Sequence, residues 1–147
     1  MYFGLSEEQE SIQDFVKKFL DDNVTVDEIR KIANGEGEEI EKSIFDSILN
    51  LGINSLLVPE EHNGLGAGLL HAVAVAQSLG SGVGPIPFVG SYVMAPIAIK
   101  LGGNEDQKNN YLSKIATNEI RFGVGMSEFV GAREDAGIEF SKNKING

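Results

Sequence analysis

The sequence of 147 residues contains no cysteine. A disulfide framework, thiolate-held metal or iron–sulfur sites and a cysteine nucleophile are therefore excluded. Histidine is nearly as scarce, since only His62 and His71 are present, which is too few for a histidine-rich metal site. Basic residues are also few, 12 against 22 acidic ones, and the formal net charge is −10. Because a nucleic-acid partner requires a basic face, we predict no nucleic-acid binding.

Long hydrophobic runs are missing as well. The longest charge-poor stretch extends from Asn63 to Ile99, but glycines and prolines interrupt it repeatedly. No segment supplies the roughly 20 uninterrupted apolar residues of a membrane-spanning helix. The first residues, Met1 to Gly4, show no basic region followed by an apolar run, so we expect no signal peptide. These absences lead us to expect a cytoplasmic protein with no membrane span.

Acidic charge, by contrast, is present and unevenly placed. Residues 1–50 hold 13 acidic and 5 basic side chains, which accounts for −8 of the net charge. A solvated helical surface is the favoured interpretation, because acidic faces mostly serve solubility. Hydrophobic residues make up 41% and charged residues 23% of the chain, close to the globular average, which predicts a folded domain.

Six helices are predicted from the spacing of the apolar residues. Three of them begin at capping boxes, in which two side chains satisfy each other's free backbone N–H groups: Ser6 with Gln9, Thr25 with Glu28, and Asn104 with Gln107. The other three are expected over about residues 38–50, 69–79 and 89–101.

Details of two of these helices follow from composition. The helix over residues 69–79 is apolar nearly all round, which predicts a central position in the fold. Pro96 falls within the helix over residues 89–101 and should kink it or delay its regular start.

Two connecting segments are also informative. Residues 53–59 are expected to form a short extended piece. The following loop, Glu60 to Gly68, has three glycines in five residues, and we favour a tight turn into the next helix. A phosphate-binding loop is the weaker interpretation, because the lysine and the serine or threonine of a P-loop are missing.

The end of the sequence changes character. Residues 121–126 alternate as a strand would, and Ile138 and Phe140 alternate with polar residues. Residues 141–144 look like a hairpin turn. The expected organisation is therefore a helical domain over residues 1–120, followed by the start of a truncated β domain over residues 121–147.

The order and spacing of four segments are informative: LSEEQ, LGINSLLVPEEHNGLGAG, GNEDQKNNYLSKIATNEIRFGVGMSE and the terminal KNKING. Together they resemble the acyl-CoA dehydrogenase family, in which a helical N-terminal domain leads into a small β domain and a C-terminal helical domain. The resemblance implies an all-α fold here, a six-helix orthogonal bundle, followed by the first strands of a truncated β domain. The stretch GVGPIPFVGSYV looks most like bacterial members that act on bulky or branched acyl groups.

The resemblance also implies a reaction. A carboxylate base takes the α-proton of an acyl-CoA thioester, FAD accepts the β-hydride, and a trans-2-enoyl-CoA is left. The electrons then pass to an electron-transfer flavoprotein, and family members are usually homo- or hetero-oligomers. Because the family's base lies in the C-terminal domain, which this sequence lacks, no catalytic residue is assigned. The chain is expected to be inactive alone.

Several residues match positions of the family that contact the flavin. Met126 stands where a backbone N–H, and Ser127 where a hydroxyl, hydrogen-bonds the ring. Val124 stands where the family often has an aromatic residue beside the flavin. A plain strand-end serine is the alternative interpretation for Ser127.

Other residues match positions that contact the substrate. Phe88 and Tyr92 lie on the helix that lines the acyl cavity in the family, and plain core aromatics are the alternative interpretation. Gly131 fits the run that touches CoA and FAD, whereas the rest of residues 129–134 departs from the family's proline and Gly-Ser-Asp pattern.

That departure keeps a second hypothesis open, namely a non-catalytic partner subunit of a heteromeric acyl-CoA dehydrogenase. A third is a flavin monooxygenase built on the same fold, which the N-terminal helices do not distinguish.

Overall fold

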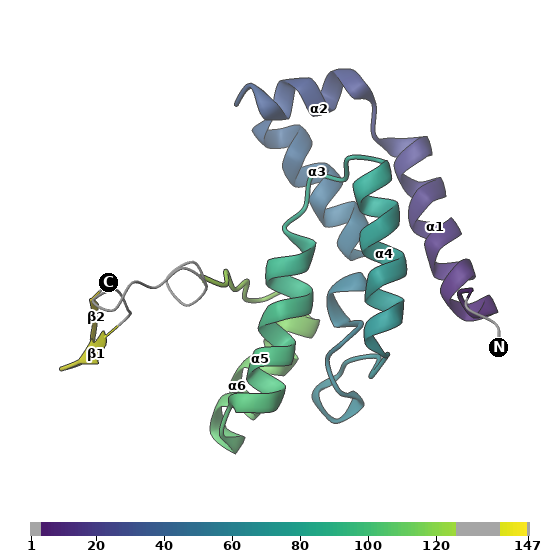
Figure 1. Cartoon of the computed structure of the whole chain (residues 1–147). Coiled ribbons are helices and arrows are strands. Elements are labelled where there is room, and N and C mark those ends of the chain that lie inside the picture. The colour runs from purple at the N-terminus through teal and green to yellow at the C-terminus, as the bar shows by residue number, and fades with distance from the viewer. Residues whose placement is uncertain (1–3, 126–138, 147) are drawn as a thin grey trace.

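The structure, a computed structural model, describes residues 4–125 and 139–146. Within these ranges it contains six α-helices and one two-stranded sheet (Figure 1). The helices are α1 (Glu7–Asn23), α2 (Val26–Ala33), α3 (Glu38–Leu49), α4 (Leu69–Ser81), α5 (Ala95–Gly102) and α6 (Glu105–Ala116). The predicted all-α fold with a short β segment is confirmed.

All three predicted capping boxes are present and fix where their helices begin. The Ser6 hydroxyl accepts the Gln9 backbone N–H at 3.3 Å, and the Gln9 side chain accepts the Ser6 N–H at 3.0 Å. Reciprocal pairs of the same kind open α2 and α6. Each box satisfies backbone donors that the first turn of a helix leaves free.

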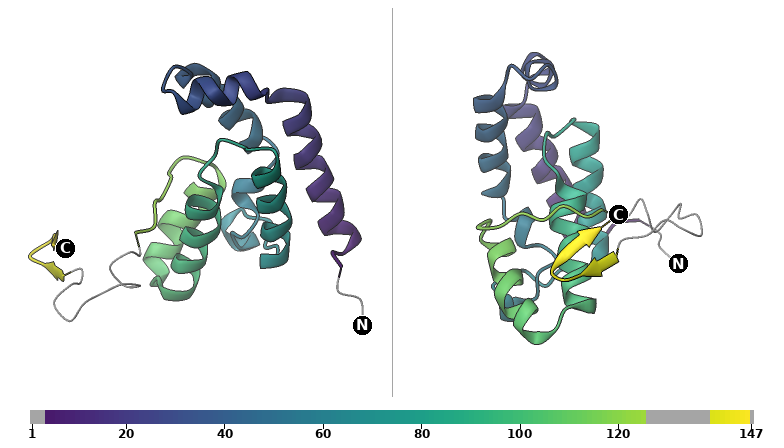
Figure 2. Two further views of the ribbon diagram at one scale, coloured as in Figure 1. Left: turned by 45° about the horizontal axis from the view of Figure 1, so that its top comes forward. Right: turned by 90° about the vertical axis from the view of Figure 1, so that its left-hand side faces the viewer.

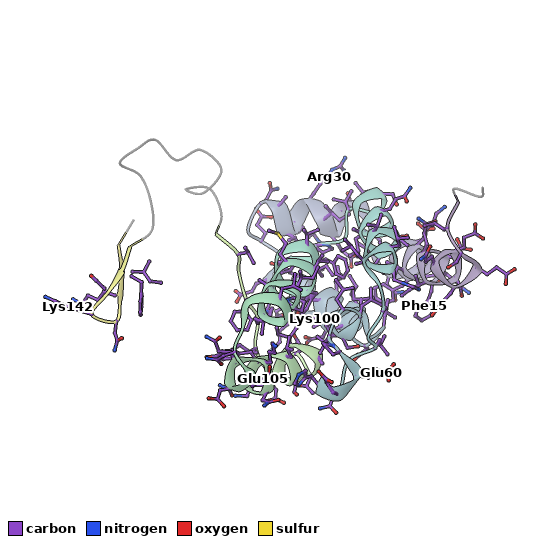
Figure 3. All side chains as sticks on the ribbon, turned by 60° about the horizontal axis from the view of Figure 1, so that its bottom comes forward. Phe15, Arg30, Glu60, Lys100, Glu105 and Lys142 are labelled. Atoms are coloured by element: carbon purple, nitrogen blue, oxygen red, sulfur yellow. The ribbon has the colours of Figure 1, made fainter. Side chains whose placement is uncertain are left out.

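The helices contact one another mainly in pairs. The two views of Figure 2, like Figure 1, show α1 and α4 side by side, and this pair makes the most extensive contact in the fold. Helix α2 lies across the ends of its neighbours, and α5 pairs with α6. Side chains fill the space between these helices in Figure 3.

A single apolar core joins the helices. It draws on α1, α3, α4 and α6 and on the segments between them. Its most completely buried large side chains include Val16, Ile48, Ile53, Leu56, Val58, Val75, Tyr92, Leu112 and Ile115.

Pro96 delays the regular start of its helix, as predicted. It lies in the first turn of α5, the part of a helix in which proline is best tolerated. The residues before it, Val89–Met94, form a wider π-helical turn, η3. Short π-helical turns are rare and recur at functional sites, so η3 marks a region to examine.

The predicted hairpin is also present. Strand β1 (Glu139–Ser141) pairs antiparallel with β2 (Lys144–Asn146). The two turn residues, Lys142 and Asn143, have φ angles of 50° and 58°, as a tight two-residue hairpin turn requires.

Three predictions were wrong in part. Helix α4 is not buried all round, because Leu69, Leu70 and Val73 are 55%, 61% and 49% exposed where no described element covers them. Residues 53–59 are not extended: Ile53–Ser55 form a 3-10 turn, η1, since Gly52 at φ 79° reverses the chain directly after α3. The described part of the predicted strand, residues 121–125, is not a strand, because the described residues offer it no neighbouring strand.

Candidate functional site

An apolar groove of about 460 Å³ lies where α4 ends and η3 begins. Among the described residues that line it, none carries a formal charge, and three are glycines that leave space. The lining comes from α4 (Ala76, Leu79, Gly80), from the connecting segment after it (Val83, Gly84, Ile86, Pro87) and from the start of the next helical turn (Phe88, Val89, Gly90).

The connecting segment is held tightly against the helices below it. A Cβ added at Gly82 would lie 2.7 Å from Leu20 Cδ1, and one added at Gly84 would lie 2.8 Å from Leu79 Cδ2. The Gly84 N–H also donates a 2.7 Å hydrogen bond to the Leu79 carbonyl. Val83, between these glycines, therefore has a fixed backbone, and its side chain is 59% exposed at the groove.

Phe88 and Tyr92 lie in different surroundings although both are buried. Phe88 contributes to the groove wall, whereas Tyr92 is fully buried in the core and is not part of that wall. The Tyr92 hydroxyl donates a 2.8 Å hydrogen bond to Asn118 Oδ1. Burial raises the pKa of the Tyr92 phenol above its ordinary value of 10.0, and the Arg121 charge opposes this shift by a smaller amount.

The segment that follows α6 is attached to η3. The Ser91 hydroxyl donates a 2.8 Å hydrogen bond to the Phe122 carbonyl, next to the bond between Tyr92 and Asn118. The Phe122 ring also packs edge-on against Tyr111, with centroids 5.5 Å apart. These contacts fix the direction in which the chain leaves the helices toward Val124.

Arg121 anchors the opposite side of this segment. Its guanidinium lies 4.3 Å from the centroid of the Phe45 ring on α3, a cation–π contact. The segment is thus held between α3 on one side and η3 on the other.

The predicted flavin-contact residues are described only in part. Val124 is 38% exposed, while Met126 and Ser127, like the predicted CoA-contact residue Gly131, lie outside the described residues. A Cβ added at Gly123 or Gly125 would meet no atom of the described residues within 4 Å, so these residues leave the chain open on both sides of Val124. In the described part of the chain, residues 123–125 form no backbone–backbone hydrogen bond.

The two histidines lie apart from the groove. His71 Nε2 is 3.5 Å from Glu8 Oε2, and His62 Nε2 is 3.7 Å from Glu61 Oε1. Within residues 4–125 and 139–146, no three histidine, cysteine, aspartate or glutamate side chains come together as metal ligands would. In the same ranges, no helix combines the length and the apolar character needed to cross a bilayer.

Residues 6–119 match the family described as "Acyl-CoA dehydrogenase, N-terminal domain". The chain belongs to the acyl-CoA dehydrogenase family. Its predicted membership is therefore confirmed, and the matched range covers all six α-helices.

Two kinds of relative show how the chain compares with full family members. It is 31% identical over 121 residues to (2S)-methylsuccinyl-CoA dehydrogenase from Cereibacter sphaeroides. The aligned residues are 80% of this chain and 21% of that relative. It is 28% identical over 127 residues to the mitochondrial isovaleryl-CoA dehydrogenases of Bos taurus and Pongo abelii, covering 85% of this chain and 30% of each relative. The chain thus spans less than a third of these relatives. No solved structure matches it significantly.

Sequence reasoning missed the residues that shape this region. Val83 and Asn118 were not predicted to take part in it, and the tethering role of Ser91 was not predicted either. The only signal for Val83 was the Gly-Val-Gly pattern at residues 82–84, which allows tight packing on both sides of one side chain. The tether between Ser91 and Phe122 joins positions 31 residues apart and has no local sequence pattern.

Proposed function

We propose that this chain forms the N-terminal part of an FAD-dependent acyl-CoA dehydrogenase, which oxidises an acyl-CoA thioester to a trans-2-enoyl-CoA. Membership of the family supports the reaction class, and the relatives named above are all acyl-CoA dehydrogenases. Because the chain spans 21% to 30% of these relatives, the catalytic carboxylate is assigned to a part of the enzyme outside this sequence.

The observation that carries the proposal is the double role of one short helical turn. Phe88, which precedes η3, and the first residues of η3 line the apolar groove, and Ser91 and Tyr92 of the same turn hold the segment that leads to Val124. The wall for an acyl chain and the approach to the predicted flavin contacts are therefore fixed by one element. Such rigid positioning of two reactants is what a transfer between them needs.

The described residues near Val124 fit a flat cofactor. The chain is open around Gly123 and Gly125, Val124 is exposed, and the backbone groups there are free of backbone partners among the described residues. Val124, Met126 and Ser127 would hold FAD, which when bound supplies the acceptor for a hydride. The chain's own task is to keep this segment in place through Ser91 and Tyr92.

The groove favours an uncharged acyl group. One relative is named for methylsuccinyl-CoA, whose acyl group ends in a carboxylate, and the others for isovaleryl-CoA, whose acyl group is a branched hydrocarbon. A carboxylate in this groove would find no cation among the described lining residues, and an unpaired charge in an apolar site is strongly unfavourable. We therefore assign an aliphatic acyl chain, with Phe88 in its wall and Tyr92 supporting the helix from the core.

The same proposal covers organisation and partners. Residues 1–120 would form the helical domain, and residues 121–147 would open a β domain. Gly131 would contact CoA, electrons would leave through an electron-transfer flavoprotein, and the enzyme would act in the cytoplasm as a homo- or hetero-oligomer. Each of these follows from the family rather than from the helices themselves.

The test is to purify the complete gene product and measure the visible absorbance of flavin before and after anaerobic addition of isovaleryl-CoA. Bound flavin that bleaches with the thioester supports the proposal. A product without flavin, alone or with its neighbouring gene product, contradicts it and favours the non-catalytic partner subunit. A product that takes up free reduced flavin, and whose flavin the thioester does not bleach, contradicts it as well and favours the monooxygenase.

Phe88 offers a direct check of the groove. Phe88→Leu should raise KM for isovaleryl-CoA, because the wall of the groove recedes. Phe15→Leu is a matched control, since Phe15 is 55% exposed on the outer face of α1 (Figure 3). Equal KM values for the two variants would show that the acyl chain does not bind in this groove.

A further inference from the structure

Val83 has a backbone conformation that valine rarely adopts. Its φ angle is 51°, in the left-handed region, where a β-branched side chain crowds the backbone. The other residues with positive φ in the described ranges are glycines, asparagines and one lysine. Asparagine tolerates this region and glycine has no side chain to crowd, so Val83 is the exception that calls for an explanation.

Packing of the core does not explain Val83. The side chain is 59% exposed and does not belong to the apolar core as the structure describes it. A glycine at this position would have avoided the crowding. The sequence instead has valine here and glycine on both sides, where the contacts with Leu20 and Leu79 leave no space for a Cβ.

What Val83 does contact is the apolar groove. It lines the groove together with Val89, which is 52% exposed, so two largely exposed valines belong to its lining. A β-branched side chain has few rotamers, and this one stands on a backbone pinned at both neighbours. The Val83 side chain is therefore rigid, and its shape restricts the space that a ligand can occupy in the groove.

We propose that Val83 determines which acyl groups the enzyme accepts, by limiting the width of the apolar groove. This inference rests on the proposed function. It adds a specificity-determining residue from the connecting segment, outside the helical turn that carries Phe88 and Tyr92. Narrow or singly branched acyl groups would pass Val83, whereas a ring would meet its methyl groups.

The test compares Val83→Gly with wild type in the complete enzyme, using cyclohexanecarbonyl-CoA and butyryl-CoA as wide and narrow substrates. We expect the ratio of their kcat/KM values, wide over narrow, to rise by roughly tenfold, within the range that one or two methyl groups contribute in a hydrophobic pocket. Val26→Gly is the control, since Val26 is 61% exposed at the start of α2, away from the groove. Its ratio should equal that of wild type.

A second variant separates groove width from backbone freedom. Val83→Asn suits the positive φ angle but places a polar amide at the groove, so it should melt at or above the wild-type temperature and lower kcat/KM for both substrates. Activity on butyryl-CoA with the wild-type ratio in Val83→Gly would overturn the inference and leave the proposed function standing. An enzyme that oxidises neither thioester and binds neither would overturn both.

Discussion

The Ser91 hydroxyl donates a hydrogen bond of 2.8 Å to the carbonyl oxygen of Phe122. This bond connects η3, which borders the apolar groove, to the open segment that begins after α6. The next residue of the turn, Tyr92, binds Asn118 of the same segment. Two consecutive side chains thus fix where the chain departs from the helical bundle, and their removal should loosen that segment before it affects the core.

Ser91→Ala should release the segment locally. The Phe122 carbonyl loses its donor, so stability should fall by about 1 kcal/mol, and amide exchange over residues 120–124 should accelerate. Urea denaturation measures the loss of stability, and hydrogen–deuterium exchange measures the faster amide exchange. Ser81→Ala is the control, because within the described part of the chain the Ser81 hydroxyl bonds only the nearby Ser78 carbonyl. Equal exchange in the two variants would show that the hydroxyl does not hold the segment.

Tyr92→Phe should change how stability depends on pH. Folded Tyr92 keeps its proton more tightly than the unfolded chain does, because burial raises its pKa. The stabilisation that this raised pKa contributes to the free energy of unfolding is therefore fully present below about pH 10. It is lost as the pH rises from there through the pKa of folded Tyr92.

The measurement is the free energy of unfolding of wild type and Tyr92→Phe from pH 7 to above pH 10. The variant should be less stable by about 1 kcal/mol near neutral pH, through loss of the bond to Asn118. Above pH 10 the two curves should converge, because only wild type has this phenol to titrate. A difference that stays constant across the whole range would contradict the assigned shift.

Asn54 stabilises the end of α6 from within the core. The side chain is 5% exposed, and its Nδ2 donates to the carbonyls of Ala116, at 2.5 Å, and Ile115, at 3.4 Å. Asn54→Ala would take this donor from the partly buried Ala116 carbonyl, while the Ile115 carbonyl keeps the backbone N–H of Asn118, and it should lower stability by about 1–3 kcal/mol. Asn109→Ala, on the exposed face of α6, should have no destabilising effect, since alanine favours helices. Urea denaturation of both variants distinguishes these outcomes.

The helices could be predicted because their signals are local. A capping box needs only Ser6 and Gln9, or Asn104 and Gln107, and the structure contains these pairs where the sequence indicates them. Pro96 similarly restricts its own turn, so the delayed start of α5 follows from one residue.

The site was less accessible to prediction because it depends on distant partners. Alternation over residues 121–125 resembles a strand, but a strand forms only beside another. Phe88 and Tyr92 are both aromatic and close in sequence, yet only the fold reveals that one lines the groove and the other bonds Asn118. The positive φ angle of Val83 has no sequence pattern beyond its two glycine neighbours.

The loop before α4 depends on one glycine for space. A Cβ added at Gly64 would lie 1.9 Å from the Val58 carbonyl oxygen, and this backbone atom cannot move aside without breaking the turn. Gly64→Ala should therefore destabilise the fold by about 3 kcal/mol or more, with a large fall in melting temperature. Gly80→Ala is the matched control, because a Cβ there meets no atom within 4 Å and alanine suits the last turn of α4. It should stabilise the fold by about 0.5–1 kcal/mol. A Gly64→Ala variant with the melting temperature of wild type would mean that the loop can move away from the Val58 carbonyl. The path of the chain into α4 would then need another explanation.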